Sequence, residues 1–174
     1  MVHTGRTCHG HGEKKSPMYS DFEKRVGGRL NDLVAALPSG TANVYLGADP
    51  SVPGALYPYF RITPTNPKSA TIRGYVIGGQ GLDFTIGQAT GGEIFAPDST
   101  ARSRANEDQF FQICQVVFTS SLTEYVTYSS RGRVIRSKIV LQLGSRSVRL
   151  GGPQLFWWAV LNRSKKNFHY EPYY

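Results

Sequence analysis

Apolar and polar residues alternate most regularly between Thr123 and Leu150. In the run 134–143, one parity is mainly apolar and the other includes two basic side chains. The apolar parity holds Ile135, Ile139, Leu141 and Leu143, and the basic residues of the other are Arg136 and Lys138. Because successive side chains of a strand point to opposite faces, the pattern indicates one buried and one exposed face. Turns at residues 130–132 and 144–145 then predict three antiparallel strands.

Two stretches have the residue spacing of amphipathic helices. The first, Ser20–Leu37, opens with a capping box, in which the side chains of Ser20 and Glu23 each accept a hydrogen bond from the other's backbone N–H. Its apolar stripe consists of Phe22, Val26, Leu30, Leu33, Val34 and Leu37. The second runs from about Ser103 to Phe118, and its apolar stripe includes Cys114. We therefore expect Cys114 to be a small buried residue rather than a nucleophile.

Shorter alternating runs between the helices predict further strands at residues 43–46, 55–63, 71–77, 82–86 and 92–96. Pro58 cannot donate to a β-ladder, so we expect the run 55–63 to be an edge strand or to contain a bulge, with Leu56 and Phe60 directed inward. Glycines at 78, 79 and 81 lie between two strands, whereas a phosphate-binding loop precedes a helix. We interpret them as a hairpin turn.

These elements predict an α+β fold with a mainly antiparallel sheet of about six to eight strands and two amphipathic helices. The order is a helix, three or more strands, a second helix and three strands, for which α-βββ-α-βββ is one arrangement. Residues 18–174 form one domain in this interpretation, and the polar residues 1–17 form a disordered tail. The apolar run 154–161 is a last strand, a short helix or an interface, and an aromatic and basic C-terminal tail follows from about residue 162.

Candidate metal ligands near the N-terminus, Cys8, His9 and His11, match no zinc-site spacing and have no second ligand pair. We predict no metal site and no cofactor. The two cysteines, Cys8 and Cys114, lie in dissimilar surroundings, which argues against a disulfide and favours a cytoplasmic location. No apolar run is long enough for a membrane span, and the N-terminus lacks the apolar core of an export signal.

The net charge of +8 is concentrated in the last third of the chain. Residues 1–119 contain eleven basic and ten acidic residues, whereas residues 120–174 contain nine basic and two acidic ones. Such asymmetry favours an anionic partner, either an acidic protein surface or a nucleic acid.

A basic and tyrosine-rich sheet face is the candidate binding surface. It combines one parity of several predicted strands: Tyr57, Tyr59, Arg61, Arg73, Tyr75, Arg136, Lys138 and Arg149. The alternative is that these residues form only the solvated face of an antiparallel sheet, or that the C-terminal aromatics cover it.

The leading functional hypothesis is a small, non-catalytic module that binds an acidic protein through this face. A second hypothesis is single-stranded nucleic-acid binding by stacking and phosphate contact, although no RRM, KH or helix-turn-helix signature is present. A third is a small enzyme. His169 with Glu171 is the only late candidate acid–base pair, so the sequence indicates no catalytic residues. No close pair is formed by the scattered acidic residues Asp49, Asp83, Glu93, Asp98 and Glu124.

Overall fold

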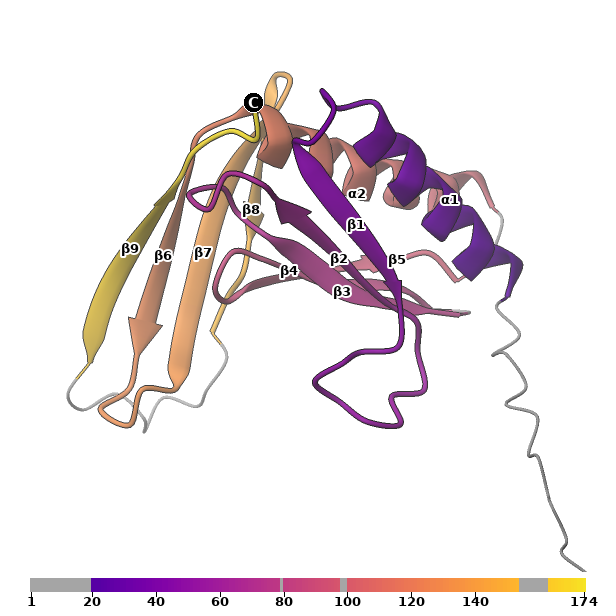
Figure 1. The fold of residues 1–174 in the computed structure, drawn as a ribbon. Coiled ribbons are helices and arrows are strands. Elements are labelled where there is room, and N and C mark those ends of the chain that lie inside the picture. Colours follow the sequence, from indigo (N-terminus) through magenta and orange to yellow (C-terminus); the bar gives the residue numbers. More distant parts are fainter. Residues whose placement is uncertain (1–19, 79, 98–99, 154–162) are drawn as a thin grey trace, which may run out of the picture.

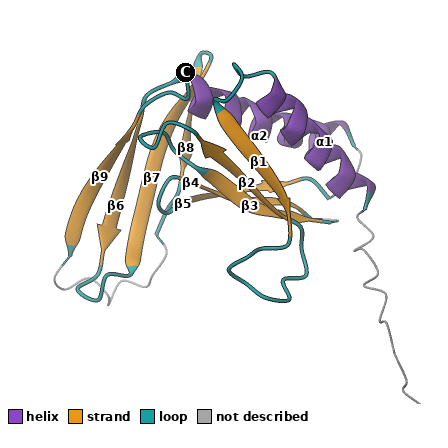
Figure 2. Cartoon of the chain, viewed as in Figure 1, coloured by secondary structure: helices purple, strands orange, loops and turns teal. Residues whose placement is uncertain are grey.

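The computed structural model describes residues 20–78, 80–97, 100–153 and 163–174, which form two helices and nine strands. The order is α-βββββ-α-ββββ, so an α+β fold with antiparallel sheets is confirmed. Figures 1 and 2 show the helices together on one side of the first sheet, with the second sheet diverging from it. The predictions for the N-terminal tail, its metal-capable residues and the apolar run 154–161 lie outside the described residues.

Helix α1 (Asp21–Ala35) starts at the predicted capping box: the backbone N–H of Ser20 donates to Glu23 Oε2 at 2.6 Å, and that of Glu23 donates to Ser20 Oγ at 3.3 Å. Helix α2 (Ala101–Thr119) is capped by Thr100. A buried carboxylate joins the helices, since Glu107 of α2 accepts hydrogen bonds from Arg25 and Arg29 of α1. Neither helix in the described part of the chain has the length and apolar character needed to cross a membrane.

The first sheet is a five-stranded antiparallel meander in which neighbours in sequence are neighbours in space. Its strands are β1 (Ala42–Gly47), β2 (Tyr59–Pro64), β3 (Ile72–Ile77), β4 (Gly81–Ile86) and β5 (Thr90–Phe95). The hairpin predicted at residues 78–81 joins β3 to β4. Gly81 has a φ of 142°, and a Cβ there would meet the carbonyl oxygen of Ile94, so this position requires glycine.

The second sheet has the order β8-β7-β6-β9 and is also antiparallel. Its strands are β6 (Leu122–Tyr128), β7 (Val134–Leu143), β8 (Arg146–Leu150) and β9 (Ser164–Tyr170). The alternation predicted along β7 is confirmed, because Ile135, Ile139 and Leu141 are buried whereas Arg136 is exposed. The sheets meet along β5, where Gly151 N–H donates to the carbonyl oxygen of Gly91 at 3.0 Å.

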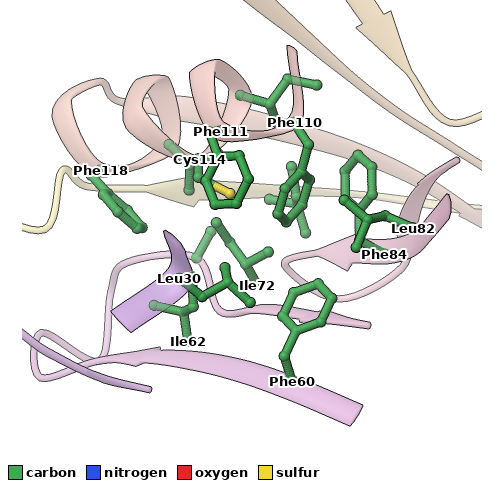
Figure 3. Close-up of a cluster of buried hydrophobic side chains, with 14 of the residues drawn as sticks. Leu30, Phe60, Ile62, Ile72, Leu82, Phe84, Phe110, Phe111, Cys114 and Phe118 are labelled. Carbon is green, nitrogen blue, oxygen red and sulfur yellow. The ribbon is translucent and has the colours of Figure 1, made fainter. Parts of the chain in front are cut away.

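The main core lies between the helices and the near face of the first sheet (Figure 3). Phe110 of α2 packs edge-on against Phe60 of β2 and Phe84 of β4, with ring centroids 5.7 and 5.0 Å apart. Cys114 is fully buried in this cluster, as predicted, and burial raises the pKa of its thiol. Because the buried parity of β2–β4 faces the helices, the opposite parity is left on the far face of the sheet.

Three expectations differ from the structure. Strand β2 begins after Pro58 and lies between β1 and β3, so the prediction of an edge strand or a bulge was wrong. Leu56 lies in the preceding loop and is 90% exposed, whereas the pattern had predicted that it points inward. The order α-βββ-α-βββ is replaced by α-βββββ-α-ββββ, although the five strands of the first half correspond to the five runs predicted there. Residues 164–170, which were predicted to belong to a C-terminal tail, form strand β9 and pair with β6. Tyr173 then packs on Phe118, with the ring centroids 4.5 Å apart.

Candidate anion-binding face

The open face of the five-stranded sheet is the face turned away from the helices. Antiparallel pairing places Arg61 of β2 directly opposite Arg73 of β3. In the adjacent row, Tyr59 of β2 lies opposite Tyr75 of β3, with ring centroids 5.6 Å apart, and Tyr75 lies opposite Asp83 of β4. Two arginines and two tyrosines from the consecutive strands β2 and β3 therefore form one block of four side chains.

This block lines a cavity of about 490 Å³, which we call the arginine cavity. Its lining residues are Asp49, Pro50, Ser51, Tyr59, Arg61, Arg73, Gly74, Tyr75, Asp83, Phe84 and Thr85. Strands β2–β4 form its floor, and the loop after β1 contributes one wall. Its volume suits a small acidic group together with part of the chain that carries it.

The two guanidinium groups line the cavity together with the carboxylate of Asp49, whose pKa the charge of Arg73 helps to lower. Within the described residues, neither Arg61 nor Arg73 forms a salt bridge, and Arg73 donates only a long hydrogen bond of 3.3 Å to the carbonyl oxygen of Gln88. Like charges directly opposite each other on neighbouring strands destabilise a sheet. An anion bound between the two groups would remove this repulsion and accept charge-assisted hydrogen bonds from both.

Asp49 holds the cavity wall in place. Its Oδ1 accepts hydrogen bonds from Ser51 N–H at 2.8 Å and Ser51 Oγ at 2.6 Å, and its Oδ2 accepts one from the Tyr75 hydroxyl. The hydrogen bonds from Ser51 and Tyr75 lower the pKa of Asp49. The bond to Asp49, with partial burial, raises the pKa of Tyr75 to about 12, so its hydroxyl stays protonated and serves as a donor to Asp49.

Asp83 lies at the other side of the cavity. Partial desolvation, with the nearby charge of Glu93 on β5, raises the pKa of Asp83. The open face therefore combines two cationic groups with acidic ones, and any bound anion has to lie closer to Arg61 and Arg73 than to Asp83.

An apolar loop adjoins the arginine cavity. Residues 52–57, between β1 and β2, include Val52 and Leu56, which are 48% and 90% exposed. With Tyr75, Ile77 and Asp83, residues 52–57 line a second cavity of about 400 Å³, the loop cavity. Since Tyr75 and Asp83 line both cavities, a polar site and an apolar site share one boundary.

The structure divides the predicted binding residues between two sheets. Tyr59, Arg61, Arg73 and Tyr75 come together in the arginine cavity, and Tyr57 lines the loop cavity beside them. Arg136 and Lys138 lie instead on β7 of the second sheet. Arg149 of β8 lines a further cavity of about 430 Å³ with Asp83 and Glu93, which places it where the two sheets meet.

Sequence reasoning missed Asp49 and Asp83 as parts of this site. Asp83 shares the parity of Thr85 and is opposite to the buried Leu82 and Phe84, so alternation alone would have placed it on the open face. Asp49 lies in a loop, and only the three-dimensional contact with Tyr75 reveals its role. No family model, curated protein or solved structure matches the chain.

Proposed function

We propose that this protein is a non-catalytic binding module that receives an acidic side chain of a protein partner between Arg61 and Arg73. The observation that carries the proposal is the pairing of these arginines in a cavity where, among the described residues, no carboxylate forms a salt bridge with either. Tyr59 and Tyr75 supply a rigid aromatic wall, which suits a protein interface.

The surroundings of the cavity favour a protein over a nucleic acid as the partner at this face. Asp83 and Glu93 would repel successive phosphates of a nucleic-acid chain, whereas a single carboxylate fits between the arginines. The exposed side chains of Val52 and Leu56 offer apolar surface to an apolar residue that neighbours the acidic one in the partner. The free, buried thiol of Cys114 accords with a cytosolic location for the module.

Fluorescence anisotropy with a labelled short peptide rich in Asp, Glu and Leu tests the proposal. The double variant Arg61→Gln/Arg73→Gln removes both cationic donors, and we expect its dissociation constant to rise at least about tenfold. A peptide with Asn and Gln in place of Asp and Glu should bind the wild-type protein no better than the acidic peptide binds the double variant.

A matched control removes the same charge elsewhere. Arg102 and Arg104 are exposed on α2, and Arg102→Gln/Arg104→Gln should leave peptide affinity nearly unchanged. Equal weakening by both double variants would show that net charge, rather than the cavity, attracts the peptide, and would overturn the proposal.

A further inference from the structure

The second sheet has an outer face with basic residues and no acidic ones among its described strands. These are the side chains of β6–β9 whose parity is opposite to the buried Glu124, Ile139 and Leu150. The outer face comprises Thr123, Tyr125, Thr127, Arg136, Lys138, Val140, Gln142, Ser147, Arg149, Lys165, Asn167 and His169. Its composition differs from that of the open face of the first sheet, which carries Asp83 and Glu93.

An exposed tyrosine lies near the middle of this face. Tyr125 of β6 is 49% exposed, with Lys138 of β7 directly opposite on one side and Asn167 of β9 opposite on the other. In the next row, Thr127 of β6 lies between Arg136 of β7 and Lys165 of β9. Residues directly opposite on neighbouring strands are about 5 Å apart, so three cations surround one ring within the reach of a short ligand.

We infer that this outer face binds single-stranded nucleic acid, with a base stacked on Tyr125 and backbone phosphates held by Arg136, Lys138 and Lys165. Within the described residues, none of these three cations forms a salt bridge, so all three are available to phosphates. Bases of a single strand are free to stack on an aromatic side chain, whereas those of a duplex are stacked on one another. A broad sheet face with one exposed ring therefore fits a single strand.

The test is anisotropy of a fluorescein-labelled oligothymidylate of about 12 nucleotides over a range of salt concentrations. With three phosphate contacts, the logarithm of the association constant should fall with the logarithm of salt concentration at a slope of about −2. Arg136→Gln/Lys138→Gln should reduce the slope to about −0.7. Tyr125→Ala should weaken binding roughly 5- to 150-fold, and Tyr125→Phe should retain the wild-type affinity.

Controls separate this surface from the arginine cavity. Arg61→Gln/Arg73→Gln should leave oligonucleotide affinity unchanged, as should Tyr174→Ala, which removes a C-terminal ring that is 63% exposed. The inference is overturned if the wild-type protein does not bind at low salt, if a duplex of the same length binds as tightly, or if Tyr125→Ala binds as well as the wild type. Each result leaves the peptide experiment on the cavity unaffected, so the two proposals fail independently.

Discussion

At the scale of single residues, the carboxylate of Glu124 accepts several hydrogen bonds in the described structure. Its Oε1 accepts hydrogen bonds from Ala89 N–H and Thr90 Oγ1, both at 2.8 Å. Its Oε2 accepts from Gln88 N–H at 2.9 Å and from the Tyr170 hydroxyl at 2.7 Å. Glu124 is fully buried on β6, so these bonds attach the turn between β4 and β5 to the second sheet.

Glu124→Gln should lower the free energy of unfolding by at least about 2 kcal/mol, measured by urea denaturation. The new amide group replaces one acceptor oxygen and leaves two buried donors without a partner. Glu171→Gln is the control, because Glu171 pairs with Lys68 at the surface and its replacement should barely change the denaturation midpoint. If the two variants were equally stable, Glu124 would not hold the sheets together.

Asp83 governs the charge of the arginine cavity. Partial desolvation and the charge of Glu93 raise the pKa of Asp83. Asp83 is therefore protonated at a higher pH than an ordinary aspartate, whose pKa is about 4. We predict that sulfate, which stays dianionic, binds the wild-type protein more tightly as the pH falls from about 7 to about 4. Asp83→Asn should bind sulfate more tightly at neutral pH and lose most of this pH dependence in calorimetric titrations. An unchanged pH dependence would assign the effect to another group.

At the scale of secondary-structure elements, α1 contains a replaceable glycine. Gly28 is exposed within the helix, and a Cβ there would have no heavy atom within 4 Å. Gly27, by contrast, faces Leu46 of β1, with 3.5 Å between an added Cβ and Leu46 Cδ1. An added Cβ would therefore make an ordinary van der Waals contact at Gly27 and meet open space at Gly28.

Gly28→Ala should raise the free energy of unfolding by about 1 kcal/mol, because alanine restricts the unfolded chain and favours the helix. Gly40 provides the contrast: it also has open space around it, but its φ is 78°. Gly40→Ala should destabilise by roughly 1–2 kcal/mol, since this conformation is strained for a residue with a Cβ. Thermal or urea denaturation of both variants distinguishes backbone conformation from available space.

Elements with strong periodicity were predictable from the sequence, and those with weak patterns were not. The capping box located the start of α1, and the period of two located β3, β4 and β7. Strand β9 was not predicted because residues 164–167 are polar and exposed along one edge of the sheet. The strand is held by its pairing with β6 and has no buried face that alternation could reveal. The prediction of an edge strand or bulge from Pro58 failed because a proline just before a strand needs no ladder partner for its nitrogen, even when the strand is central.

At the scale of the whole molecule, function depends on how the two sheets are joined. Alternation indicated that basic and tyrosine side chains share a parity in several strands, but strand order decides which of them become neighbours. The break between β5 and β6, where α2 intervenes, separates the arginine cavity from the outer face with Arg136 and Lys138. One predicted surface therefore becomes two, which adjoin where Arg149 of β8 lines a cavity with Asp83 and Glu93.

Binding of an acidic side chain between Arg61 and Arg73 is measured most directly by a nuclear magnetic resonance titration of ¹⁵N-labelled protein with the acidic, leucine-containing peptide. We predict that the largest chemical-shift changes fall on residues 49, 51, 59, 61, 73–75 and 83–85, which line the arginine cavity. They should disappear in Arg61→Gln/Arg73→Gln. Chemical-shift changes centred on residues 136–138, or spread evenly over all basic residues, would contradict binding of the peptide in the arginine cavity.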